Sequence, residues 1–121
     1  MRDFEGKQIL VVEDDAIIAW DLATLLDERG ASVILASCAV EAVAAITNRG
    51  PHAAIVDVDL RGESSESICR RLSLAMIPFA FYTGYGAKPE HWPFAPLIEK
   101  PASYDQILSC AKRLCHAVPV E

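Results

Sequence analysis

Strand-like and helix-like segments alternate along almost the whole chain. This alternation favours right-handed strand–helix–strand units and a parallel sheet covered on both faces. Three prolines, Pro89, Pro93 and Pro96, interrupt the region between the last two strands, so a helix there must be short or irregular. The expected strands are Gln8–Val12, Ser32–Ala36, Ala53–Val56, Ile77–Tyr82 and Leu97–Ile98, and the other expected helices are Ala16–Arg29, Val40–Asn48, Ser64–Ser73 and Tyr104–Cys115.

Length and charge limit what the chain can do. With 121 residues it is expected to form one domain over residues 1–121. Its net charge of −6 argues against binding nucleic acid, which needs clustered lysines and arginines. A charged start and the lack of a long apolar run argue against a signal peptide or a membrane helix, so we expect a soluble, cytoplasmic protein. The four cysteines lack C-x-x-C spacing and are expected to be reduced thiols.

Ionisable side chains follow three of the expected strands. Glu13 and Asp14 come after the first strand, Asp57 after the third and Lys100 after the fifth. Groups at the carboxyl ends of parallel strands converge on one crevice, so these side chains are expected to share a pocket. Clustered carboxylates repel one another unless a cation sits among them, and a hard divalent ion such as Mg2+ is the natural counter-ion.

In order and spacing these residues resemble the receiver domains of two-component response regulators, over nearly the whole chain. Receivers have an acidic pair after strand one, a phosphoaccepting aspartate after strand three, a threonine or serine after strand four and Lys-Pro after strand five. Glu13–Asp14, Asp57, Thr83 and Lys100–Pro101 occupy those places. The resemblance implies a flavodoxin-like α/β fold, a doubly wound (βα)5 parallel sheet with strand order 2-1-3-4-5.

The resemblance also implies a role for each pocket residue. Asp57 would be the nucleophile that accepts a phosphoryl group, Lys100 would pair with that group, and the Thr83 hydroxyl would move toward it. The metal ligands would be Glu13, Asp14, Asp57 and the backbone carbonyl of Val58, and Pro101 would follow a cis peptide that aims Lys100 inward. Asp15 is expected to cap the helix that begins at Ala16.

Several positions depart from the usual receiver pattern. Leu97 stands where receivers commonly carry the aromatic residue of the switch, and the loop 60–65 lacks the usual Pro-Gly. The segment from Phe81 through Thr83 and Gly84 to Tyr85 resembles the Phe-Ala-Thr-Gly-Tyr motif of an atypical subgroup of stand-alone receivers from alphaproteobacteria. Asp59 and Tyr85 lie two residues beyond Asp57 and Thr83, at positions that tune phosphate lifetime in the family.

The expected function is that of a stand-alone, single-domain response regulator. It would accept phosphate from a sensor histidine kinase or a histidine phosphotransferase, lose it by self-dephosphorylation and act on a downstream protein as relay, sink or adaptor, as a monomer or weak homodimer. The alternative is a receiver-like interaction module that binds partners without phosphorylation. A flavodoxin-like cofactor binder or hydrolase is disfavoured because the acidic loop 13–16 has no glycine to cradle a phosphate.

Overall fold

The computed structural model describes residues 2–84 and 91–116. A parallel sheet of five strands runs in the order β2-β1-β3-β6-β7, which is the expected order 2-1-3-4-5 when these strands alone are counted. Within the described ranges no helix has the length and apolar character needed to cross a membrane. The elements are β1 Gln8–Val12, α1 Ala16–Glu28, β2 Ser32–Ala36, α2 Ala39–Arg49, β3 Ala53–Val56, β4 Asp59–Leu60, β5 Glu63–Ser64, α3 Glu66–Leu74, β6 Phe79–Thr83, β7 Leu97–Glu99 and α4 Tyr104–Cys115.

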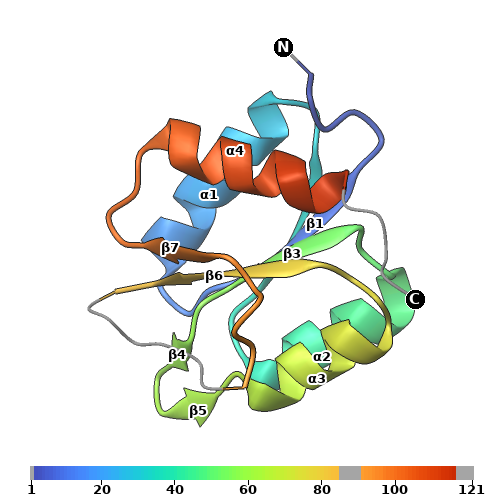
Figure 1. Cartoon of the computed structure of the whole chain (residues 1–121), viewed down its shortest axis with the longest axis vertical. Helices are drawn as coiled ribbons and strands as arrows, with labels where there is room; N and C mark the ends of the chain where they lie inside the picture. Colours follow the sequence, from blue (N-terminus) through green and yellow to red (C-terminus); the bar gives the residue numbers. More distant parts are fainter. Residues whose placement is uncertain (1, 85–90, 117–121) are drawn as a thin grey trace.

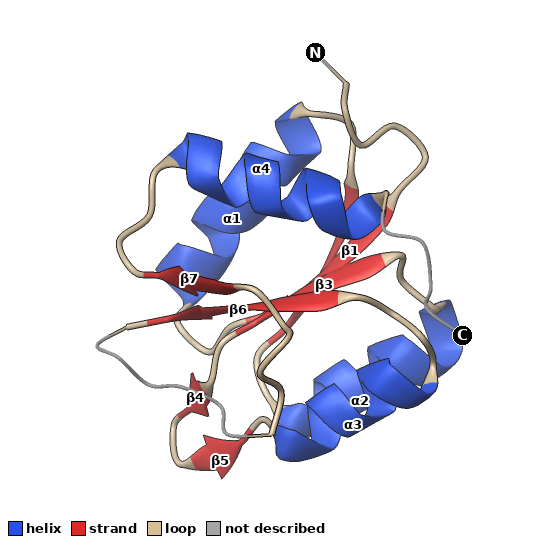
Figure 2. Cartoon of the chain, viewed as in Figure 1, coloured by secondary structure: helices blue, strands red, loops and turns tan. Residues whose placement is uncertain are grey.

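The sheet lies between two layers of helices. Helices α1 and α4 cover one face, and α2 and α3 cover the other (Figure 1). The same arrangement is visible when the chain is coloured by secondary structure, with the small β4–β5 hairpin standing beside the ends of the central strands (Figure 2). The expected flavodoxin-like doubly wound fold is therefore confirmed.

Each central strand contributes to both layers of the core because successive side chains of a strand point to opposite faces. In β1, Ile9 and Val11 pack with the α1 and α4 side chains, and Leu10 and Val12 pack with those of α2 and α3. All four are buried. The continuous apolar run therefore forms a central strand covered on both sides, as parallel sheets require.

Several predicted boundaries are wrong by a few residues. The fourth sheet strand was predicted from Ile77 but begins at Phe79, because the Ile77 amide donates to the Leu72 carbonyl at 2.9 Å and so belongs to the end of α3. It continues to Thr83, which pairs with Glu99 of β7. The third helix was predicted from Ser64 but begins at Glu66, because Glu63–Ser64 pair with β4 instead.

Turns and bends replace a regular helix in the described part of the connection between β6 and β7, residue 84 and residues 91–96. Trp92 lies in this connection and packs edge-on against Phe79, with ring centres 5.7 Å apart. Its indole nitrogen donates to Glu66 at 3.1 Å, so the connection is tied to the start of α3. The predicted irregular fourth helix falls partly on residues 85–90, outside the described residues.

Candidate functional site

The predicted pocket forms at the carboxyl ends of β1, β3 and β7. Backbone hydrogen bonds carry the parallel ladder one residue past the strands, from the amide of Glu13 to Ala36, of Asp57 to Val12 and of Lys100 to Thr83, at 2.8 to 2.9 Å. These bonds fix the direction in which each functional side chain leaves the sheet. As a result, residues from three distant segments meet at one edge.

Three carboxylates lie together in this pocket. One oxygen from each of Glu13, Asp14 and Asp57 can be chosen so that all three lie within 4.8 Å of one another. Glu13 and Asp57 are buried, at 3% and 6% exposure, whereas Asp14 is half-buried. Hard oxygen ligands at this spacing suit Mg2+, whose ligands on opposite sides lie about 4 Å apart, so the residues present fit such an ion.

Lys100 joins two of these carboxylates. Its ammonium donates to Glu13 Oε1 at 2.7 Å and to Asp57 Oδ2 at 3.0 Å. The second Asp57 oxygen, Oδ1, accepts the backbone N–H of Asp59 at 3.1 Å. Both oxygens of Asp57 are therefore engaged, and the carboxylate is held in one orientation.

Burial and charge shift the pKa values in the pocket. Burial raises the pKa of Glu13 to about 7, with the neighbouring Asp57 adding to the rise and the Lys100 ammonium opposing it. For Lys100, burial alone would lower the pKa, but hydrogen bonds to Glu13 and Asp57 outweigh it and the pKa is raised. The ammonium therefore keeps its charge, and Glu13 titrates near neutral pH.

The structure also describes Thr83, Val58 and Asp59 of the predicted site. The Thr83 hydroxyl is buried at the end of β6 and donates a long, 3.4 Å hydrogen bond to the Gly84 carbonyl. Val58 is half-buried, and Asp59 is exposed with Oδ1 accepting from the Gly62 amide at 3.4 Å.

Three further predictions concern Leu97, Pro101 and Asp15. Leu97 is half-buried and packs against the core on the α2 and α3 side. Pro101 follows a cis peptide, as predicted. Asp15 caps α1 by accepting the amides of Ile17 and Ile18, also as predicted. Tyr85 lies outside the described residues.

Two residues of the site were not predicted from the sequence. The Lys100 ammonium lies over the ring of Tyr82, and the Arg61 guanidinium pairs with Asp14 at 3.2 Å. For Arg61 a signal was present, because a residue followed by glycine between two short strand-like pairs is typical of a two-residue hairpin turn. The loop 60–65 was interpreted only as an altered receiver loop.

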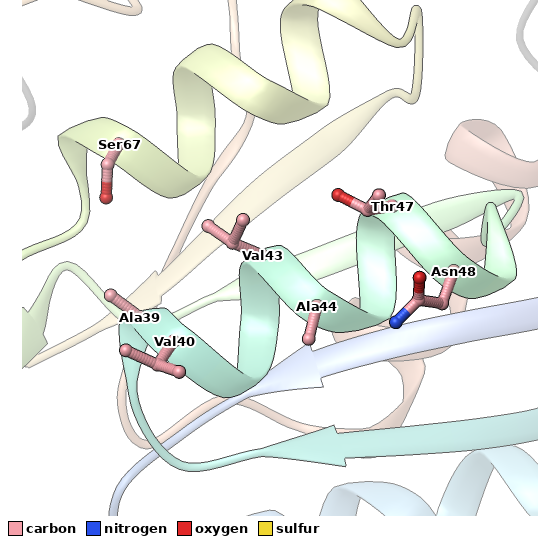
Figure 3. A pocket seen from close by; sticks show the side chains of 7 residues that line it. All are labelled: Ala39, Val40, Val43, Ala44, Thr47, Asn48 and Ser67. Atoms are coloured by element: carbon pink, nitrogen blue, oxygen red, sulfur yellow. The ribbon is translucent and has the colours of Figure 1, made fainter.

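An open groove of about 460 Å³ lies elsewhere, along α2. Figure 3 shows that its lining comes from α2, including Val40 and Val43, with Ser67 contributed by α3. The lining holds no carboxylate or ammonium group. The cluster of ionisable side chains therefore lies at the strand ends and not along this groove.

Solved structures with the same architecture identify the fold. The receiver domain of NtrX from Brucella abortus is 27% identical, with a TM-score of 0.82, and the match covers 91% of this chain and 99% of that one. The chain has the fold of a response regulator receiver domain. Another match is the signal receiver domain of a modulated diguanylate cyclase from Desulfovibrio desulfuricans, at 25% identity, a TM-score of 0.77, and 91% and 94% coverage.

A response regulator receiver protein from Sinorhizobium medicae shares the receiver fold at 20% identity, with a TM-score of 0.82 over 93% of this chain and 97% of that one. The sequence matches no protein-family model and no curated protein. The likeness of this chain to the receiver domain of NtrX supports a response regulator role in two-component signalling.

Proposed function

We propose that this receiver domain is a phosphorylation switch in which Asp57 accepts a phosphoryl group from a phosphohistidine on a sensor histidine kinase or a histidine phosphotransferase. The observation that carries the proposal is the contact of the Lys100 ammonium with Asp57 at 3.0 Å, inside a pocket with two further carboxylates. A lysine held between acids by geometry and burial can neutralise a phosphoryl group attached to one of them.

The transfer needs little from the protein beyond positioning and charge. An oxygen of Asp57 attacks the phosphorus in line, the phosphorus–nitrogen bond breaks, and the imidazole nitrogen keeps the electron pair. Because Asp57 is held by Lys100 and by the Asp59 amide, its carboxylate is oriented before the donor arrives. Glu13, Asp14, Asp57 and the Val58 carbonyl would hold Mg2+, which supplies further positive charge to the phosphoryl oxygens.

We expect the buried Thr83 hydroxyl to move when Asp57 is phosphorylated. Its hydrogen bond to the Gly84 carbonyl is 3.4 Å long, so exchanging it for a charged phosphoryl oxygen gains free energy. The movement of Thr83 would alter the start of the β6–β7 connection and thereby the surface that a partner protein recognises. The protein would then act in the cytoplasm as relay, sink or adaptor according to how long the phosphate lasts.

The alternative, a receiver-like module that binds partners without phosphorylation, rests on Leu97. This residue replaces the usual aromatic switch and packs against the core, so the switch in its usual form is absent at that position. The pocket nevertheless contains three carboxylates and a lysine. A module that binds partners without phosphorylation would not need them. We therefore favour the phosphorylation switch.

The test is direct. The protein is incubated with Mg2+ and phosphoramidate or acetyl phosphate, and its intact mass is followed with time beside Asp57→Asn. We expect a Mg2+-dependent gain of one phosphoryl group that the variant lacks, and the rate of its loss separates a sink from an adaptor. If neither small donor nor a phosphorylated kinase produces the adduct, the constitutive binding module becomes the better description.

A further inference from the structure

A two-residue hairpin follows the candidate phosphoacceptor. Strands β4 and β5 pair antiparallel, and Arg61 and Gly62 form the turn with positive φ values of 53° and 86°. Two consecutive left-handed residues are the geometry of the tight turns that match the twist of a hairpin. Arginine rarely adopts this conformation, so the pairing of β4 with β5 holds the backbone of Arg61 at the tip of the turn.

The hairpin is anchored on both sides of its tip. On the β4 side, the Asp59 amide donates to Asp57 Oδ1, and Leu60 is buried in the core. On the β5 side, Glu63 Oε1 accepts the Ala39 amide at the start of α2, at 3.1 Å. The position of Arg61 relative to the pocket is therefore set by the fold.

From this tip Arg61 reaches the pocket carboxylate that Lys100 does not touch. Its Nε lies 3.2 Å from Asp14 Oδ2, whereas Lys100 pairs with Glu13 and Asp57. The two cations thus divide the three carboxylates between them. The Arg61 side chain is 79% exposed, so it is free to leave Asp14 at little cost.

We propose that Arg61 is a second cation of the phosphoryl site, which holds Asp14 in the metal-free protein and moves to the phosphoryl group on Asp57 when Mg2+ takes Asp14. This inference rests on the proposed function. A metal ion that binds Asp14 displaces the guanidinium. A phosphoryl group on Asp57, whose carboxylate lies within 4.8 Å of that of Asp14, then offers the guanidinium new anionic oxygens. The planar guanidinium donates paired hydrogen bonds that match phosphate oxygens, and it keeps its charge at any physiological pH.

Two effects of opposite sign distinguish this role from a merely structural one. Without the guanidinium, Mg2+ no longer has a competitor at Asp14, so Arg61→Gln should bind Mg2+ about threefold more tightly. The same variant should be phosphorylated about fivefold more slowly at saturating Mg2+, because one charge on the phosphoryl oxygens is lost. A variant that disturbed only the fold would weaken both.

The experiment measures the Mg2+ dissociation constant by calorimetry and the phosphoramidate reaction by intact mass. The variants are Arg61→Gln, Arg61→Lys and the control Arg71→Gln, which removes the same charge from the exposed end of α3. We expect Arg71→Gln to match the wild type. Arg61→Lys should keep the wild-type Mg2+ affinity and recover only part of the rate, because an ammonium cannot make the paired contact.

Agreement of Arg61→Gln with Arg71→Gln in either measurement, in a wild-type protein that does gain a phosphoryl group, overturns the inference and leaves the proposed function standing. A wild-type protein that binds Mg2+ but is not phosphorylated by any donor overturns both.

Discussion

The Lys100 ammonium lies over the ring of Tyr82, 5.2 Å from its centre. Tyr82 is 9% exposed and stands on β6, next to the strand that Lys100 follows. The face of an aromatic ring carries partial negative charge and attracts a cation, most strongly where water is excluded. The ring therefore acts with Glu13 and Asp57 to hold the ammonium in the pocket.

This contact predicts that the ring, and not the hydroxyl, of Tyr82 supports the site. Tyr82→Phe should retain both stability and phosphorylation rate, whereas Tyr82→Leu should lose about 1 kcal/mol of unfolding free energy and react several-fold more slowly. Urea unfolding and intact-mass kinetics measure the two effects. Equal rates in the phenylalanine and leucine variants would show that the ring face does not matter.

Glu13 predicts an unusual pH dependence. Its pKa is raised from 4.5 to about 7 in the folded protein, chiefly by burial, so the folded state binds the proton that the unfolded chain has already released. Between these values stability therefore falls as pH rises. The metal-free protein should lose up to about 2 to 3 kcal/mol from about pH 5 to about pH 8.

Denaturant unfolding with a chelator present, repeated across this range, measures the loss. Glu13→Gln cannot ionise and should flatten the profile. A variant profile as steep as that of the wild type would mean that another group is responsible.

Lys100 should matter most when metal is absent. Replacing it by methionine keeps most of the side-chain volume but leaves Glu13 and Asp57 facing each other without a cation, which should cost about 2 kcal/mol in chelator. Added Mg2+ should then raise the melting temperature of Lys100→Met more than that of the wild type.

Lys112→Met is the matched control, because it removes a lysine whose side chain is 58% exposed. The Lys112 Nζ lies 3.9 Å from Asp3 Oδ1. It should change stability by less than about 0.5 kcal/mol. A Mg2+ response of Lys100→Met no larger than that of this control would contradict the predicted charge compensation.

The hairpin turn should be sensitive to its glycine. Gly62 has a φ of 86° and open space where a Cβ would stand, so Gly62→Ala introduces backbone strain of about 1 kcal/mol without a clash. Its displacement of Arg61 should reproduce the tighter Mg2+ binding expected of Arg61→Gln. Gly6→Ala, with a φ of 77° and the same open space, should cost similar stability without changing Mg2+ affinity.

Those elements whose ends carry local signals could be predicted closely from the sequence. The strand Ala53–Val56 and the helix Tyr104–Cys115 match the prediction residue for residue. The strand is preceded by Gly50-Pro51, and the helix begins with a capping box in which Ser103 and Gln106 satisfy each other's backbone amides. The helix predicted from Ser64 starts late because strand pairing competes for the same residues, and that competition depends on distant anchors.

The pocket residues were predictable for the same reason that the sheet was, since strand ends converge whatever the intervening sequence. Tyr82 and Arg61 could not be predicted as site residues. Their contacts with Lys100 and Asp14 depend on the direction of each side chain, which sequence spacing does not specify. Tyr82 belongs to an apolar strand and contacts Lys100 only because both lie on the same side of neighbouring strands. Arg61 meets Asp14 only because the turn aims it across the pocket.

The hairpin tip is a part of the chain where we expect substitutions to be tolerated better than in the sheet and its helices. This tip, Arg61 and Gly62, is exposed and lies outside both core clusters, although it follows closely after Asp57, the proposed phosphoacceptor. We therefore expect substitutions at the tip to alter the proposed binding of cations and phosphate while the sheet and its helices fold as before. A signalling protein built this way can acquire a different response time by changing one exposed residue.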